Sequence, residues 1–268
     1  MIRGAVLGSP IEHSLSPVLH RAAFVDLQIE GSYDRIEVGA GELKNFLSER
    51  GSEFDYLSLT MPLKEEVLQL GFATSDLALK SQSANTLIKS GGSWSATSTD
   101  GTGFLQALAH RGFSDFSSVL ILGAGGTSRA IAAALDGVAD SITVLGRTST
   151  REESFNEIVT ESQFSYVMWS NAFSLEPFSL VVNTTPAGAA DLLAEGIDGG
   201  ITSLLFDVIY KPWPTVLAKK WSNVGAPVIS GLELLLYQGI DQLRLVSAKD
   251  FDTEELASTL REKLSSAR

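Results

Sequence analysis

The chain has 268 residues, of which 44% are hydrophobic and 19% are charged, and this composition excludes an intrinsically disordered protein. The formal net charge of −12 argues against a nucleic-acid partner, because proteins that grip nucleic acid carry a basic surface. The chain has no cysteine, which excludes disulfides and thiolate sites, and its three histidines lack metal-ligand spacing, so we expect no metal.

The chain opens on an apolar, strand-like run at residues 2–8 that has no signal-peptide pattern. No later apolar stretch approaches the ~18 residues of a membrane span. We therefore expect a soluble, cytoplasmic protein with no membrane partner.

Strand-like and helix-like runs alternate along the chain, which predicts an α/β protein with a mainly parallel sheet. The expected strands are residues 4–7, 33–38, 56–59, 85–89, 118–122, 141–145, 180–183, 204–207 and 227–229. The expected helices are residues 17–27, 42–49, 64–70, 103–111, 127–135, 214–222, 232–246 and 253–265. The last two helices have no strand after them, so we expect them to pack back on the first part of the chain.

Two serines, Ser14 and Ser16, precede the first expected helix. In an extended segment their hydroxyls project the same way, and both can donate to one carboxylate. The alternative is purely structural: Ser16 caps the helix and Pro17 occupies its first position.

A lysine, Lys64, follows the expected strand at 56–59, in the place where open α/β sheets bind ligands. An ammonium there can donate a proton to a ketone oxygen as hydride arrives. Asp100, further along, can pair with Lys64 and hold it. The alternatives are a solvated lysine and a helix-capping or turn aspartate.

A glycine-rich loop joins the expected strand at 118–122 to the expected helix at 127–135, with the spacing Gly-x-Gly-Gly-x-x-x-Ala from Gly123 to Ala130. Residues without Cβ let backbone N–H groups approach a diphosphate at a helix N-terminus. A dinucleotide site is therefore predicted, although a tight strand-to-helix turn would need similar glycines.

The strand after this loop ends in Gly146-Arg147-Thr148, with Arg151 shortly beyond. An NAD site usually carries an acidic residue at this tip to bind the ribose 2′-hydroxyl. Here the tip has none, and Arg147 can pair with a 2′-phosphate. NADP is therefore favoured over NAD, with two solvated arginines as the alternative.

Taken together, these motifs resemble the shikimate dehydrogenase family over nearly the whole chain. The motifs that carry the resemblance follow one another in family order: Gly8–Pro17 with His20, Thr60-Met61-Pro62-Leu63-Lys64, Ser83-Ala84-Asn85-Thr86, Thr99-Asp100-Gly101, Gly123–Ala130, Asn183-Thr184-Thr185-Pro186-Ala187-Gly188, Asp207-Val208-Ile209-Tyr210, and Gly231-Leu232 through Gln238. Each motif alone is weak, but eight in register are specific.

The resemblance implies a two-domain protein and the NADPH-dependent, reversible reduction of 3-dehydroshikimate to shikimate, a step of aromatic amino-acid biosynthesis. Residues 1–102, with 232–268 returning to them, would form the substrate-binding and catalytic domain. Residues 103–231 would form a Rossmann-type NADP-binding domain. We expect a monomer or a homodimer.

The resemblance also implies roles at the matching positions. Lys64 and Asp100 would be the catalytic pair. The substrate-binding residues would be Ser14, Ser16, Thr60, Asn85, Tyr210 and Gln238. The cofactor-binding residues would be Gly123, Ala124, Gly125, Gly126, Thr127, Arg147, Thr148, Arg151, Thr184, Val208, Gly231 and Leu234.

This sequence departs from the family pattern at a few positions. Ser58, Ser98 and Gly146 stand where many members have Asn, and Leu234 replaces a frequent Met. Losing the Asn at Gly146 would weaken the grip on a 2′-phosphate.

Three other functions stay open. A quinate/shikimate dehydrogenase that uses NAD would share the motifs, as would an NADP-binding sensor that has lost catalysis. A folate-type methylene dehydrogenase also uses a lysine beside a nucleotide domain, but the paired serines fit it poorly.

Overall fold

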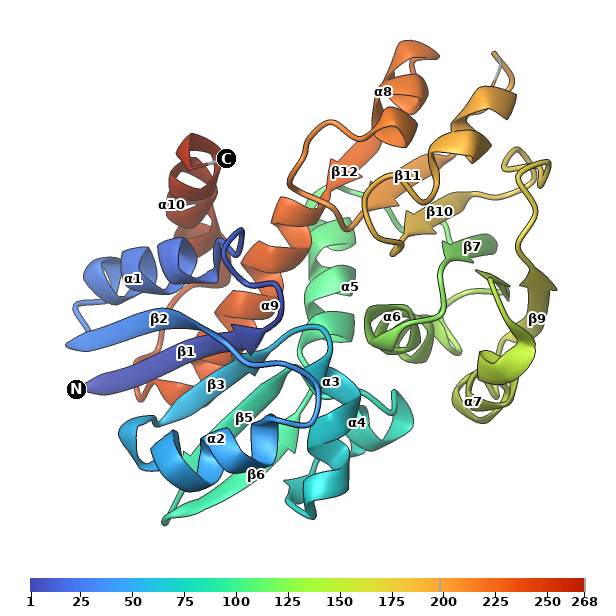
Figure 1. The fold of residues 1–268 in the computed structure, drawn as a ribbon. Helices are drawn as coiled ribbons and strands as arrows, with labels where there is room; N and C mark the ends of the chain where they lie inside the picture. Colours follow the sequence, from blue (N-terminus) through green and yellow to red (C-terminus); the bar gives the residue numbers. More distant parts are fainter. Residues whose placement is uncertain (198, 268) are drawn as a thin grey trace. The chain divides into compact units, whose positions relative to one another are not determined.

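The computed structural model describes residues 1–197 and 199–267, which fall into two compact units (Figure 1). Unit 1 holds Met1–Phe104 and the carboxy-terminal segment from Leu235 onward, and unit 2 holds Leu105–Leu234. Within the described ranges, no helix is long and apolar enough to cross a membrane.

Unit 1 is built on a six-stranded mixed sheet with the order β2-β1-β3-β5-β6-β4. Its strands are β1 (Ile2–Gly8), β2 (Gly31–Glu37), β3 (Tyr56–Leu59), β4 (Ala73–Thr74), β5 (Thr86–Ser90) and β6 (Ser93–Thr97). β1 runs parallel to both β2 and β3, whereas β5 is antiparallel to β3 and β6. The parallel part therefore brings the loops after β1 and β3 to the same edge of the sheet.

The first helices of unit 1 each follow one of these strands along the chain, whereas the last lies near the carboxy terminus. They are α1 (Ser16–Asp26), α2 (Leu43–Arg50), α3 (Leu63–Glu66), α4 (Asp76–Lys80) and α10 (Thr253–Ser266), with 3₁₀ turns at Gly51–Glu53 and Val67–Leu70. The expected helix at 64–70 is thus one short α-helix followed by a 3₁₀ turn. The carboxy-terminal α10 packs against α1, which confirms that the end of the chain returns to the first unit (Figure 1).

Two helices, α5 (Asp100–His110) and α9 (Gly231–Val246), begin in one unit and end in the other. Inside unit 1 they approach closely where Gly103 meets Gln238. A Cβ on Gly103 would lie 2.5 Å from the backbone nitrogen of Gln238. Glycine at 103 therefore lets the backbones of the two helices touch.

Unit 2 has a Rossmann-type fold with a fully parallel six-stranded sheet in the order β12-β11-β10-β7-β8-β9. The strands are β7 (Ser118–Leu122), β8 (Ser141–Gly146), β9 (Gln163–Met168), β10 (Leu180–Asn183), β11 (Leu204–Asp207) and β12 (Val228–Ser230). The helices are α6 (Gly126–Leu135), α7 (Glu152–Ile158) and α8 (Val216–Asn223), with 3₁₀ turns at Ser149–Arg151 and Asp191–Gly196. The expected α/β class is confirmed.

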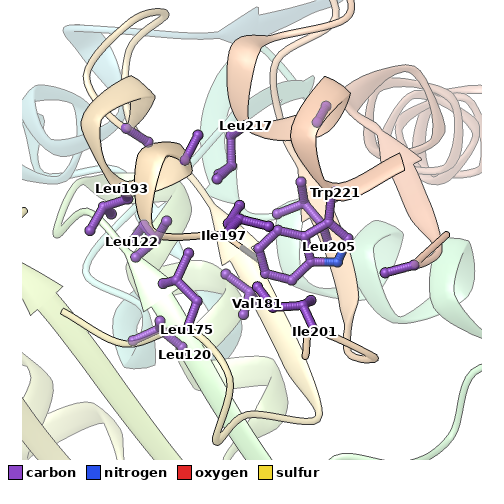
Figure 2. Close-up of a cluster of buried hydrophobic side chains, with 14 of the residues drawn as sticks. Leu120, Leu122, Leu175, Val181, Leu193, Ile197, Ile201, Leu205, Leu217 and Trp221 are labelled. Carbon is purple, nitrogen blue, oxygen red and sulfur yellow. The ribbon is translucent and has the colours of Figure 1, made fainter. Parts of the chain in front are cut away.

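One hydrophobic cluster of unit 2 is centred on Trp221 of α8 (Figure 2). This side chain is fully buried, and its indole N–H donates to the carbonyl of Ser203 at 2.7 Å. Leu120, Val181 and Leu205 of three neighbouring strands belong to the same cluster. A buried indole needs such a partner, because an unpaired N–H in an apolar core is costly. The cluster supports the strands from which the loops of the next section emerge.

A second buried feature, in unit 1, is an aromatic cluster around His20 of α1. The His20 ring stacks on Tyr33 with centroids 4.0 Å apart, and its Nδ1 lies 2.8 Å from the Tyr56 hydroxyl. Burial lowers the pKa of His20 from 6.5 to about 3, an effect that the side chain of Gln242 partly offsets. His20 is therefore neutral in the folded protein at neutral pH.

This depressed pKa predicts a pH-dependent loss of stability. Below pH 6.5 the unfolded chain protonates His20 while the folded protein does not until about pH 3, so the free energy of unfolding falls through that window. Within this window, protonation of His20 in the unfolded chain lowers the free energy of unfolding by roughly 1.4 kcal/mol per pH unit. Urea unfolding at pH 7 and 5.5 should show this extra loss in the wild type and not in His20→Phe. Equal pH slopes in the two proteins would contradict the assignment.

Candidate active site

Lys64 and Asp100 form a close ion pair in unit 1. Lys64 lies in α3, directly after β3, and Asp100 is the first residue of α5. The ammonium Nζ donates to Asp100 Oδ2 at 2.5 Å, and the two side chains are 16% and 6% exposed. The pair is thus largely shielded from solvent. In such a shielded place an ion pair is stronger than at an open surface. A freely solvated Lys64, the alternative left open above, is wrong.

Asn85, directly before β5, holds the other side of the Asp100 carboxylate. Its Nδ2 donates to Asp100 Oδ1 at 2.7 Å and lies 3.2 Å from Gln238 Oε1 on α9. Its Oδ1 accepts from the backbone N–H of Thr99 at 2.9 Å. Since a backbone N–H can only donate, this contact fixes which way the amide points. Four of the expected site residues, Lys64, Asn85, Asp100 and Gln238, therefore meet in one cluster.

The two serines lie beyond the same sheet edge as Lys64. Backbone hydrogen bonds join the carboxyl end of β1 to the segment after β3, from Ser9 N to the Met61 carbonyl at 3.0 Å and from Thr60 N to the Leu7 carbonyl at 2.9 Å. Ser14 and Ser16 are each 6% exposed. Helix α1 starts at Ser16 itself, without a side-chain cap, so the capping role considered for Ser16 is wrong.

Thr60 directly follows β3, shortly before Lys64 in the chain, and is half-buried. Gly8 packs against it: a Cβ at Gly8 would lie 2.4 Å from Thr60 Cγ2 and 2.8 Å from the carbonyl oxygen of Met61. The glycine that opens the first motif is therefore needed to let the two loops approach.

In unit 2, the glycine loop closes between β7 and α6. Gly123 has a φ of +102°, and a Cβ there would lie 2.8 Å from Thr184 Oγ1, so only glycine fits. Ser128 takes the third-glycine position: its Oγ accepts from Gly125 N at 3.1 Å and lies 2.6 Å from Thr184 Oγ1. Thr184, from the loop after β10, thereby holds the glycine turn in shape.

The remaining loop residues lie at or next to the N-terminus of α6. Gly125 precedes the helix and Gly126 begins it, with Ala124 and Thr127 on either side. A Cβ at Gly125 would meet nothing within 4 Å, so the space beside this backbone is open. The donor set is that of a diphosphate cradle: backbone N–H groups at the start of a ten-residue helix.

The tip of β8 carries the basic residues as expected, with Arg147, Thr148 and Arg151 all exposed. Tyr166 of β9, a residue outside the sequence motifs, donates its hydroxyl to the Thr148 carbonyl at 2.7 Å. A Cβ at Gly146 would lie 1.8 Å from that hydroxyl oxygen. The departure at Gly146 thus has a physical reason: the tyrosine occupies the space that a side chain would need.

A buried aspartate, Asp207, organises the loops after β10 and β11. Its carboxylate accepts from Thr215 Oγ1 at 2.7 Å, from Asn183 Nδ2 at 3.1 Å and from the Ile209 N–H at 3.1 Å. Burial raises the pKa of Asp207, and these three donors oppose that shift. The carboxylate therefore fixes the backbone just before Tyr210, a half-buried residue.

The start of α9 contacts the same segment. A Cβ on Gly231 would lie 1.9 Å from the carbonyl oxygen of Val208, so only glycine permits this approach. Leu234, one turn further along the helix, is 7% exposed. The expected residues Val208 and Gly231 are thus in contact through their backbones.

A family model described as the shikimate dehydrogenase substrate binding domain matches residues 6–87. A curated shikimate dehydrogenase (NADP(+)) of Staphylococcus aureus (strain JH9) is 31% identical over 269 residues, covering 97% of this chain and 98% of the relative.

Solved structures give the same picture over the full length. The shikimate dehydrogenase of Mycobacterium tuberculosis has a TM-score of 0.86 and 33% identity, covering 98% of this chain and all of that one (100%). The shikimate 5-dehydrogenase of Thermus thermophilus, solved in complex with NADP(H) and shikimate, has a TM-score of 0.83 and 30% identity, with coverages of 98% and 100%.

Proposed function

The chain belongs to the shikimate dehydrogenase family, and from this membership we propose how its residues reduce 3-dehydroshikimate to shikimate with NADPH. It is an NADP-dependent oxidoreductase of the shikimate pathway. The observation that carries the proposal is the shielded Lys64–Asp100 pair, held by Asn85 at the sheet edge where the two serines also lie.

The substrate is a small cyclic acid with several hydroxyls, and unit 1 offers matching groups. Ser14 and Ser16 donate their hydroxyls to the substrate carboxylate. Thr60, Asn85 and Gln238 bind the ring hydroxyls, with Asp100 as a further acceptor. Tyr210 is the remaining residue that we assign to substrate binding. In this assignment residues 1–102 and 232–268 form the substrate domain.

Residues 103–231 form the NADP domain, and their donor set fits the cofactor. The N-terminus of α6 and the loop Gly123–Gly126, with Thr127, hold the diphosphate. Arg147, Thr148 and Arg151 bind the 2′-phosphate, because the tip of β8 offers cations and hydroxyls and no carboxylate. Thr184, Val208, Gly231 and Leu234 border the nicotinamide. When bound, NADPH supplies the hydride.

Lys64 handles the proton of the reaction. In the reducing direction its ammonium hydrogen-bonds the ring ketone, stabilises negative charge that develops on the oxygen, and gives up one proton to form the hydroxyl. Asp100 keeps the amine oriented before the transfer. In the oxidising direction the neutral amine takes the hydroxyl proton back. Between turnovers the lysine takes a proton from solvent in the reducing direction and releases one to solvent in the oxidising direction.

A kinetic panel tests this function. Shikimate and quinate are each oxidised with NADP and with NAD, and 3-dehydroshikimate is reduced with NADPH. We expect the highest kcat/KM for shikimate with NADP. A preference for quinate with NAD would replace the proposal by the quinate/shikimate alternative. NADPH binding without turnover of either acid would identify a cofactor sensor instead.

A further inference from the structure

A chain of buried hydrogen bonds runs through unit 1 and ends on the Asp100 carboxylate. It begins at the Tyr33 hydroxyl, which donates to Ser58 Oγ at 2.5 Å, and Ser58 donates to Gln242 Oε1 at 2.6 Å. Gln242 Nε2 donates to Thr86 Oγ1 at 2.8 Å, and Thr86 donates to Asn85 Oδ1 at 2.8 Å. Asn85 Nδ2 then donates to Asp100 Oδ1 at 2.7 Å.

The direction of these bonds follows from groups that can act in one way only. The backbone carbonyl oxygen of Asn85 lies 3.4 Å from Gln242 Nε2 and can only accept a hydrogen bond. The amino group of Gln242 therefore faces β5, and its Oε1 faces Ser58. The Thr86 hydroxyl accepts from Gln242 and has a single proton, which it must give to Asn85 Oδ1. Every donor in the chain therefore points toward Asp100.

The chain members are inaccessible to water, so each depends on the next for its hydrogen bonds. Tyr33, Thr86 and Gln242 are fully buried, and Ser58 is 6% exposed. Leaving a buried polar group unpaired is costly, and this cost holds each member in its orientation. Bonds aligned in series also strengthen one another in a medium of low dielectric constant.

We propose that Thr86 and Gln242 are positioning residues that set the orientation of Asn85, and through it the Asp100 carboxylate that holds Lys64. The inference rests on the proposed function, because it assigns the residues behind that catalytic pair. Asp100 has two oxygens, and the chain occupies Oδ1 so that Oδ2 faces the lysine. Ser58, where many family members have Asn, joins Tyr33 to this chain.

Thr86→Val tests the proposal, because it removes the hydroxyl with almost no change of shape. We expect kcat for 3-dehydroshikimate to fall about 10-fold, since small misplacements of catalytic groups have effects of this order. The KM for NADPH should not change, because Thr86 lies in the substrate domain. Thr86→Ser keeps the hydroxyl and should restore kcat to within about two-fold of the wild type.

The matched control is Thr97→Val. Thr97 pairs with Thr86 across β5 and β6, and its hydroxyl lies 2.8 Å from Ser75 Oγ, outside the chain to Asp100. The control loses a threonine hydroxyl from the same sheet and should keep wild-type kcat. If Thr97→Val lowers kcat as much as Thr86→Val does, the effect is general loosening of the sheet and the proposal fails.

A double-mutant cycle with Gln242→Met addresses whether the two residues act through one path. Either single variant interrupts the chain, so the double variant should lose no more kcat than the worse single one. If the loss of kcat in the double variant equals the product of the two single losses, the two residues do not act through a shared path. If the wild type turns over shikimate and Thr86→Val has the same kcat, only the positioning role is refuted. If the wild type does not turn over shikimate, the proposed function itself is refuted.

Discussion

Replacing Lys64 by alanine should lower kcat for 3-dehydroshikimate by about 100-fold or more, the usual size of a lost general acid. The reason is that the methyl group cannot hydrogen-bond the ketone oxygen or supply its proton. Lys64 is also the cation that faces Asp100 Oδ2 at 2.5 Å, so the carboxylate is left with Asn85 on its other oxygen. Steady-state rates with saturating NADPH measure the effect directly.

The control for this experiment is Lys44→Ala, which removes an exposed lysine from α2 of the same unit. Its kcat should match that of the wild type. Circular dichroism and thermal unfolding show whether Lys64→Ala still folds, because breaking a shielded ion pair can also destabilise the protein. A folded Lys64→Ala protein with kcat within two-fold of the wild type would remove the lysine from the mechanism.

The motifs predicted much of the candidate site because they sit where the backbone itself is constrained. Gly123 needs a positive φ, and Gly231 touches the Val208 carbonyl. Because only glycine meets these backbone constraints, the constraints leave a trace in the sequence. Lys64 was expected at the end of a strand, where parallel sheets place ligands. Strands β7, β10 and β11 of unit 2 were recognisable because they are buried, almost wholly apolar runs.

Other parts of the fold leave a weaker trace in the sequence. Strand β6 and strand β9 carry partly exposed, polar faces, so they lack the apolar run by which their neighbours were recognised. Helix α7 spans only Glu152–Ile158, too short for a clear period of 3.6 residues. Short elements of this kind take their structure from the packing around them, which a local pattern does not contain.

The supporting residues behind the site were not visible for a different reason. Gln242 lies 156 positions from Thr86, and Tyr166 lies 18 from Thr148, so their partners appear only when the chain is folded. A buried glutamine or a tyrosine at a strand tip has no distinctive spacing. The pairing of Lys64 with Asp100 was therefore predictable, while the groups that orient the pair were not.

Replacing Arg147 by alanine should shift cofactor selectivity away from NADPH. The side chain is exposed at the end of β8, next to a backbone that Tyr166 holds through the Thr148 carbonyl. A hydrogen bond to a charged group contributes about 1.5–3 kcal/mol, so the KM for NADPH should rise about 10- to 100-fold. The KM for NADH should stay within two-fold, because NADH has no 2′-phosphate. Initial rates with both cofactors at saturating 3-dehydroshikimate give the two constants.

Two further variants separate charge from geometry at this position. Arg147→Lys keeps the cation and loses the planar fork, so its KM for NADPH should lie between those of the wild type and Arg147→Ala. Arg111→Ala removes an exposed arginine that follows α5 in the same unit, outside the motifs assigned to the cofactor, and should change neither constant. If Arg147→Ala raises both KM values equally, Arg147 contacts the adenine face shared by the two cofactors and does not select the phosphate. If it raises neither, the tip of β8 does not bind the cofactor through this residue.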